Sequence, residues 1–147
     1  MKGDNILLSV KPRSFTAFGA VRKTTIQHFP SKTVTMTEAL AMVGGLNDNT
    51  ADASAVYLFR FEDPEVVAKL RPDLREKLGD YQVPVIYRLN LRYPKAWFVA
   101  RYIQMHDKDI IYVATHSVAE FAKFFRIVQL LVTSARYGVL ISNDLED

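Results

Sequence analysis

The chain has 147 residues, of which 49% are hydrophobic and 24% are charged. These proportions are ordinary for a folded soluble protein, and the length suits one domain. The 19 basic and 16 acidic residues leave a net charge of +3, an excess too small and too dispersed to indicate a nucleic-acid partner.

The chain contains no cysteine, which excludes disulfides, thiolate metal sites and a cysteine nucleophile. No uninterrupted apolar run reaches the length of a transmembrane helix. The first five residues are not followed by the apolar core and small-residue cleavage site of a signal peptide, so none is predicted in this chain.

The amino-terminal third has the pattern of short strands. Residues 5–10 form an apolar run that predicts a strand entered from a turn. A second strand is predicted over residues 14–21, in which Gly19 indicates a bulge or a close approach of two backbones. Residues 26–29 are expected to pair back as a hairpin.

The clearest local signal predicts a short helix over residues 36–43. Thr35 and Glu38 have the spacing of an N-cap residue and its N3 partner. Gly44 and Gly45 follow, and glycine accepts the left-handed conformation that often ends a helix. Apolar residues recur at helical spacing on one side: Ala39, Leu40 and Val43. We therefore expect an α+β fold in which this helix docks on a sheet.

After a strand predicted at residues 55–61, the composition changes. Residues 62–80 are charged and helix-prone, and Pro64 and Pro72 occupy positions typical of a first helical turn. This pattern predicts either two short helices or one mobile insertion outside the core, over about residues 62–82.

The next segments alternate between strands and turns. Residues 83–91 predict a strand and residues 92–96 a turn, followed by a short extended or helical piece at residues 97–100. A further turn at residues 107–109 precedes a last strand at residues 110–113.

A weak internal echo links the two ends of this region. Residues 3–8 resemble residues 108–113, since in each an acidic turn residue precedes an apolar strand about one domain length away from the other. If each strand closes a unit, residues 1–10 close a unit that precedes this chain, and the chain is the carboxy-terminal piece of a longer protein. Chance similarity is the alternative.

A long amphipathic helix is predicted over residues 117–138. Ser117 and Glu120 have capping-box spacing, and Gly138 would end the helix. The broad apolar face consists of Phe121, Phe124, Phe125, Val128, Leu131, Val132 and Ala135. The narrow polar stripe consists of Lys123, Arg126, Gln129, Thr133 and Arg136. This helix fits docking on a core, lying on a membrane, or spanning one in a ring whose lumen faces the polar stripe. Residues 139–147 form an acidic tail without an assigned structure.

The sequence lacks a recognisable catalytic or metal-binding constellation. His28, His106 and His116 are far apart, and none has a partner at metal-ligand spacing, so neither a metal nor another cofactor is predicted. His106 and Asp107 are expected to form a solvated turn pair. With no nucleophile elbow and no phosphate-binding loop, the protein is not expected to be an enzyme.

One surface could contact a ligand. The hairpin region combines basic and aromatic residues, which are Phe15, Phe18, Arg22, Lys23, His28 and Lys32. Ordinary surface decoration is the more frequent meaning of such a pattern, and contact with a polymer or partner is the alternative.

Several short motifs, in their order and spacing, resemble the soluble-ligand-binding β-grasp (SLBB) domain of outer-membrane polysaccharide export proteins. The motifs are Phe18-Gly-Ala-Val21, Thr37-Glu-Ala-Leu-Ala, Gly44-Gly-Leu-Asn-Asp48, Ala51-Asp-Ala-Ser-Ala-Val-Tyr-Leu-Phe-Arg60, Val85-Ile-Tyr-Arg-Leu-Asn-Leu91, Asp109-Ile-Ile-Tyr-Val113 and Ala119-Glu-Phe-Ala-Lys-Phe124. The resemblance covers most of the chain.

The resemblance implies a β-grasp sheet around the helix at residues 36–43, with the domain over residues 11–116. It implies capsule or exopolysaccharide export through a homo-oligomeric ring in the periplasm and outer membrane. It also implies a possible inner-membrane export partner, and a pore built from helices such as residues 117–138. The family's lipoprotein signal and amino-terminal export domain are not among these residues, so this chain would be a fragment.

Two alternatives stay open beside this hypothesis. A free-standing β-grasp module could bind a small ligand or a partner protein. An enzyme subunit is the second alternative, and the missing acid–base or nucleophile constellation argues against it.

Overall fold

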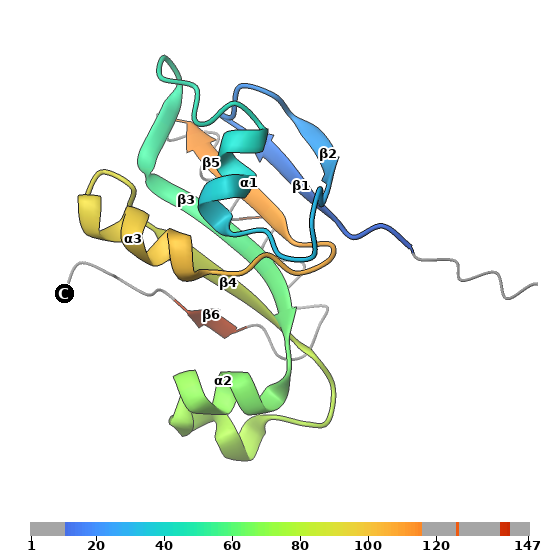
Figure 1. Ribbon diagram of the computed structural model, residues 1–147. Coiled ribbons are helices and arrows are strands. Elements are labelled where there is room, and N and C mark those ends of the chain that lie inside the picture. Colours follow the sequence, from blue (N-terminus) through green and yellow to red (C-terminus); the bar gives the residue numbers. More distant parts are fainter. Residues whose placement is uncertain (1–10, 116–125, 127–138, 142–147) are drawn as a thin grey trace, which may run out of the picture.

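The computed structural model describes residues 11–115, 126 and 139–141. The elements are β1 (Ser14–Gly19), β2 (Thr25–His28), α1 (Met36–Met42), β3 (Ala51–Glu62), α2 (Pro64–Leu70), the 3-10 helix η1 (Pro72–Lys77), β4 (Val83–Leu89), α3 (Pro94–Tyr102), β5 (Ile110–Thr115) and β6 (Val139–Ile141). Within these residues, one six-stranded sheet has the order β2-β1-β5-β3-β4-β6 (Figure 1).

The strand directions give the sheet a β-grasp arrangement. β1 is antiparallel to β2 and parallel to β5, whereas β3 is antiparallel to both β4 and β5. α1 connects the β1–β2 hairpin to β3 and lies across the sheet (Figure 1). The predicted α+β fold, with a sheet held around one helix, is therefore confirmed.

Both ends of α1 are capped by the residues that the sequence predicts. The Thr35 hydroxyl accepts a hydrogen bond from the Glu38 backbone N–H at 3.3 Å. At the other end, Gly44 and Gly45 have φ values of +81° and +78°. Their N–H groups donate to carbonyls of the last turn at 3.1 and 2.8 Å, as in a Schellman motif. Local sequence chemistry therefore sets the length of this helix.

The main core lies between one face of the sheet and the helices α1 and α3. Alternate residues of β1, β3, β4 and β5 point into it, because successive strand side chains face opposite sides. Its largest fully buried side chains are Phe15, Met36, Leu40, Leu58, Leu89 and Ile111.

The opposite face of the sheet is rich in aromatic rings. Phe18 packs against Tyr112 with 4.9 Å between ring centroids, and Tyr57 lies 6.4 Å from Tyr112. Gly19 ends β1 beside them with φ +85°, and a Cβ there would lie 2.2 Å from the carbonyl oxygen of Val113. The predicted close approach at Gly19 is confirmed, because only glycine fits this position.

Of the two alternatives predicted after β3, the structure has the two short helices, α2 and η1. The segment was expected to lie outside the core, but α2 packs on the sheet. Val67 of α2 is fully buried against Val83 and Val85 of β4, with Leu74 and Leu78 packed beside them. This second, smaller core lies under α2.

The segment after β4 differs from its prediction. Residues 92–96 were expected to form a turn, but a nine-residue helix, α3, begins at Pro94. Proline is favoured at the first helical position because its φ is already helical and its missing N–H has no partner to lose. Ala96 and Ala100 then pack inward and anchor the helix.

Some strand limits also differ. β1 ends at Gly19 rather than at residue 21, β3 begins at Ala51, and β4 ends at Leu89. The tail was left without an assigned structure, but β6 pairs in parallel with β4. A short apolar run can therefore add a strand even inside an acidic segment.

Two predicted elements fall outside the described residues, namely the strand at residues 5–10 and nearly all of the helix at residues 117–138. Arg126, from the predicted polar stripe, is helical and exposed. The other residues of the apolar face and polar stripe of this predicted helix lie outside the described residues, so their roles stay predictions. None of the helices that are described is long and apolar enough to cross a bilayer.

Candidate functional site

A buried polar cluster interrupts the apolar face of β3. Val56 and Leu58 belong to the main core, and Arg60 and Glu62 follow on the same face at the next alternate positions. In the sheet, Arg60 lies beside Val85 and Glu62 beside Val83, which belong to the small core under α2. The cluster therefore occupies the junction between the two cores.

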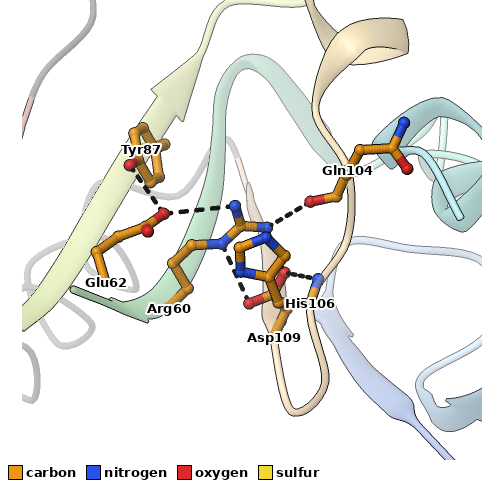
Figure 2. Close-up of polar contacts among 6 residues, drawn as sticks. All are labelled: Arg60, Glu62, Tyr87, Gln104, His106 and Asp109. Carbon is orange, nitrogen blue, oxygen red and sulfur yellow. Dashed lines mark hydrogen bonds and ion pairs between the residues drawn. The ribbon is translucent and has the colours of Figure 1, made fainter. Parts of the chain in front are cut away.

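Figure 2 shows the Arg60 guanidinium between two carboxylates. Its Nε donates to Asp109 Oδ1 at 3.2 Å, and an Nη donates to the second Asp109 oxygen. The same Nη donates to the Gln104 carbonyl at 2.8 Å, and the other lies 3.5 Å from Glu62 Oε1. The side chains of Arg60 and Asp109 are only 8% and 2% exposed.

The two carboxylates are also bonded on their other sides. The His106 backbone N–H donates to Asp109 at 2.7 Å, and the Tyr87 hydroxyl donates to Glu62 at 3.1 Å. No buried side-chain nitrogen or oxygen in the described part lacks a hydrogen-bond partner. The cluster is thus internally satisfied, and it attaches residues 104–109 to the sheet.

Tyr87 stays neutral at physiological pH. Burial, followed by the nearby Glu62 carboxylate, raises the pKa of the Tyr87 phenol to about 12. Both effects disfavour the phenolate, because it would be poorly solvated and would face another negative charge. Tyr87 therefore acts as a hydrogen-bond donor to Glu62 rather than as a base.

A pocket of about 340 Å³ opens next to this cluster, at the carboxyl end of α3. It is lined by Leu58, Arg60, Tyr87, Tyr102, Ile103, Gln104 and His106. The volume lies at the small end of the range for ligand sites, about 300–1,000 Å³. Tyr102, Gln104 and His106 are exposed and can offer a ring and hydrogen-bonding groups to a polar ligand.

The buried charged groups of the cluster have their partners within the fold, since Arg60 is bonded to Asp109 and Glu62 to Tyr87. Among the residues that the structure describes, no group of three His, Asp or Glu side chains could hold a metal ion.

The hairpin residues predicted as a possible contact surface do not gather on one face. Phe15 is fully buried in the main core, whereas Phe18 packs on the opposite face of the sheet. The exposed members are Arg22, Lys23, His28 and Lys32. Arg22 forms an ion pair with Asp48 at 2.9 Å, and the Lys32 carbonyl accepts a hydrogen bond from Arg13. A contact between these four residues and polymer stays a prediction.

The predicted pair of His106 and Asp107 is wrong in its partner. The Asp107 carboxylate accepts a hydrogen bond from the Ser14 backbone N–H at 2.9 Å, at the start of β1. His106 instead lines the pocket. A carboxylate that accepts a hydrogen bond from a backbone N–H gains a charge-assisted bond, which accounts for this choice of partner.

Sequence reasoning missed the residues of the polar cluster. Arg60 and Glu62 stand at alternate positions of an apolar strand, so the pattern already placed both on the core face. A buried arginine needs a carboxylate partner. Nothing local identified Asp109, which lies 49 residues from Arg60.

Comparisons with known proteins give a consistent result. Residues 13–113 match the SLBB domain family. The chain is 34% identical over 129 residues to the capsule polysaccharide export protein BexD of Haemophilus influenzae, covering 86% of this chain and 33% of that protein. It is 30% identical over 141 residues to the capsule polysaccharide export outer membrane protein CtrA of Neisseria meningitidis, covering 94% and 36%.

A third relative matches over a shorter part of the chain. The Vi polysaccharide export protein VexA/TviF of Salmonella typhi is 34% identical over 86 residues, which cover 58% of this chain and 21% of that protein. The chain thus spans about a third of the length of the first two relatives.

Proposed function

Because this chain belongs to the SLBB domain family of polysaccharide export proteins, we propose that it is a non-catalytic part of a capsule polysaccharide export apparatus. The observation that carries the proposal is its similarity to export proteins from three different bacteria. One of them is named as an outer membrane protein, which supports a place in the periplasm or outer membrane.

The geometry of the site supports a scaffold with a binding surface. The buried charges serve the fold, and the open groups near the pocket can form hydrogen bonds and ring contacts. Such groups suit a polar polymer that is held weakly and passed on, since they contribute contacts without a reacting centre.

We further propose that the complete protein assembles as a homo-oligomeric ring. In this ring, the β-grasp domains contact one another, and the segment at residues 117–138 associates with the outer membrane. An inner-membrane export partner would deliver the polymer to the ring. The amphipathic sequence of that segment supports the membrane contact.

A genetic experiment tests the export role. Disruption of the gene that encodes this chain, in its source organism, should remove polysaccharide from the cell surface and leave it inside the cell. Reintroduction of the intact gene should restore surface polymer. Unchanged surface polysaccharide in the disrupted strain would contradict the proposal.

The ring has a separate test. Native mass spectrometry of the full-length protein, extracted from membranes in mild detergent, should show one closed oligomer with a fixed number of copies. A monomer that is absent from the membrane fraction would contradict both the ring and its membrane contact.

A further inference from the structure

The outer face of α3 is unusually aromatic. Ala96 and Ala100 point into the main core, so the opposite side of the helix faces solvent. That side carries Phe98 and Tyr102, which are 64% and 82% exposed, and Trp97 lies at its flank, 41% exposed. Tyr93, just before the helix, is 51% exposed. Large exposed aromatic rings that cluster on one element mark a binding surface more often than chance exposure does.

The same region is purely basic. No aspartate or glutamate occurs between Asp80 and Asp107, although the chain has 16 acidic residues in all. Within α3, Lys95 and Arg101 are exposed, and no described acidic residue pairs with either one. These two cations therefore lie open among the rings, ready for an anionic partner.

The surface is also held in place. The Trp97 indole N–H donates to the Leu91 carbonyl at 2.9 Å, which fixes the orientation of its ring. The segment that follows α3 is attached to the sheet by the hydrogen bonds of Arg60 and Asp109. A preorganised surface loses less conformational freedom when it binds a ligand.

We propose that the outer face of α3 binds an anionic polysaccharide chain. The rings of Trp97, Phe98 and Tyr102 stack on the apolar faces of sugar rings, as aromatic side chains do with flat ligand surfaces. Lys95 and Arg101 pair with carboxylate or phosphate groups of the polymer. Tyr102 also lines the pocket, so the polymer can continue from the helix into it.

A polymer fits this surface better than a second copy of the chain does. Two copies that met through the same face would bring Lys95 and Arg101 of each copy against those of the other, and like charges repel. An anionic polymer removes this repulsion. The inference rests on the proposed export role for its choice of a saccharide.

The binding test uses Trp97 as a built-in probe, because it is the only tryptophan in the chain. Polygalacturonate, a polymer of acidic sugars, should change the Trp97 fluorescence of the full-length chain in a saturable titration. Neutral dextran of similar length should not. Raised salt should weaken binding, since it screens the charges.

Matched variants locate the surface. Phe98→Ala with Tyr102→Ala, and separately Arg101→Glu, should each weaken polygalacturonate binding by about tenfold or more. The controls are Tyr81→Ala, which removes another exposed ring, and Arg75→Glu, which changes the net charge equally on the distant helix η1. Both controls should bind within about twofold of the wild type. Circular dichroism should show that all variants are folded.

Several results would overturn the proposal. They are no response to polygalacturonate, equal losses in the control variants, tighter binding of a single-stranded oligothymidine than of polygalacturonate, or a size increase with protein concentration that Arg101→Glu abolishes. Binding to purified protein is independent of export in cells. Normal binding with unchanged surface polysaccharide in the disrupted strain would therefore reject the export role alone. If the purified wild-type protein did not bind polygalacturonate but the disrupted strain lost its surface polysaccharide, the binding role of α3 alone would be rejected.

Discussion

Helices α1 and α3 pack on the same face of the sheet (Figure 1). They differ in the kind of side chain that each exposes to solvent. α1 buries Met36, Ala39 and Leu40 and exposes only small or polar groups, such as Glu38 and Ala41. α3 instead anchors itself through two alanines and turns its large rings outward. Two neighbouring helices on one sheet can therefore have different roles. α1 fills the core with its large side chains, whereas α3 leaves its large side chains available for contact with a partner.

Their ends are built differently as well. At the start of α1 the Thr35 hydroxyl accepts a hydrogen bond from the Glu38 backbone N–H, whereas α3 begins with Pro94 and has no side-chain cap.

Both helices are also joined to distant segments. The Met36 N–H at the start of α1 donates to the Ile103 carbonyl at 2.9 Å, and Gln104 and His106, which follow α3, are bonded to Arg60 and Asp109. The two helices therefore differ in their caps, whereas the segment after α3 connects both of them to the sheet by long-range polar bonds.

The largest expected effect comes from breaking that long-range attachment. Asp109→Ala leaves the buried Arg60 guanidinium without its main partner, which should lower the free energy of unfolding by about 3–5 kcal/mol. Urea denaturation at pH 7 measures the change. A loss below about 1 kcal/mol for Asp109→Ala would show that the attachment contributes little.

The next effect contrasts the two helices directly. Leu40→Ala in α1 opens a cavity in the main core and should lower the free energy of unfolding by about 2–5 kcal/mol. Phe98→Ala in α3 removes a larger but mostly exposed side chain, so it should change stability by less than about 0.5 kcal/mol. Thermal and urea unfolding measure both variants. Equal losses would mean that α3 is as buried as α1.

A smaller effect concerns the cap of α1. Thr35→Ala removes the acceptor for the Glu38 N–H and should lower the free energy of unfolding by about 1 kcal/mol. Thr50→Ala, at an exposed turn position, is the control and should stay within about 0.5 kcal/mol of the wild type. The urea midpoint distinguishes the two. Equal midpoints would contradict the capping role of Thr35.

The smallest effect is confined to alkaline solution. The Tyr87 phenol keeps its proton in the folded protein up to a pKa of about 12, whereas it ionises near its ordinary value of 10.0 when unfolded. Its contribution to stability is therefore complete below pH 10 and is lost as the pH rises towards 12. The difference in urea midpoint between wild type and Tyr87→Phe should shrink from pH 9 to pH 11. A constant difference would contradict the raised pKa.

The sequence predicted those parts of the fold that depend on local chemistry. Thr35 and the Gly44–Gly45 pair mark the ends of α1, and Gly19 marks a close approach, because each feature has a signature within a few residues. Pro94 carried the same signature as Pro64 and Pro72 but was interpreted as a turn residue. Applying one rule to all three prolines would have located α3.

The candidate site was less predictable, because its parts come from distant segments. Asp109 meets Arg60 only once β5 lies beside β3, and the basic face of α3 has meaning only when Ala96 and Ala100 are known to point inward. The predicted hairpin surface included Phe15 because of its residue type. In the structure that ring is buried, because alternate residues of a strand face opposite sides of the sheet. Residue type indicates a possible contact, and only the fold decides which side faces solvent.

The contrast between the two helices has one direct measurement, which is the backbone amide spectrum of the isotope-labelled chain during titration with polygalacturonate. We predict saturable shifts along residues 94–102 and near His106, with no comparable shifts along α1. Shifts concentrated on α1 or on the exposed hairpin residues Arg22, Lys23, His28 and Lys32, with α3 unchanged, would contradict the account.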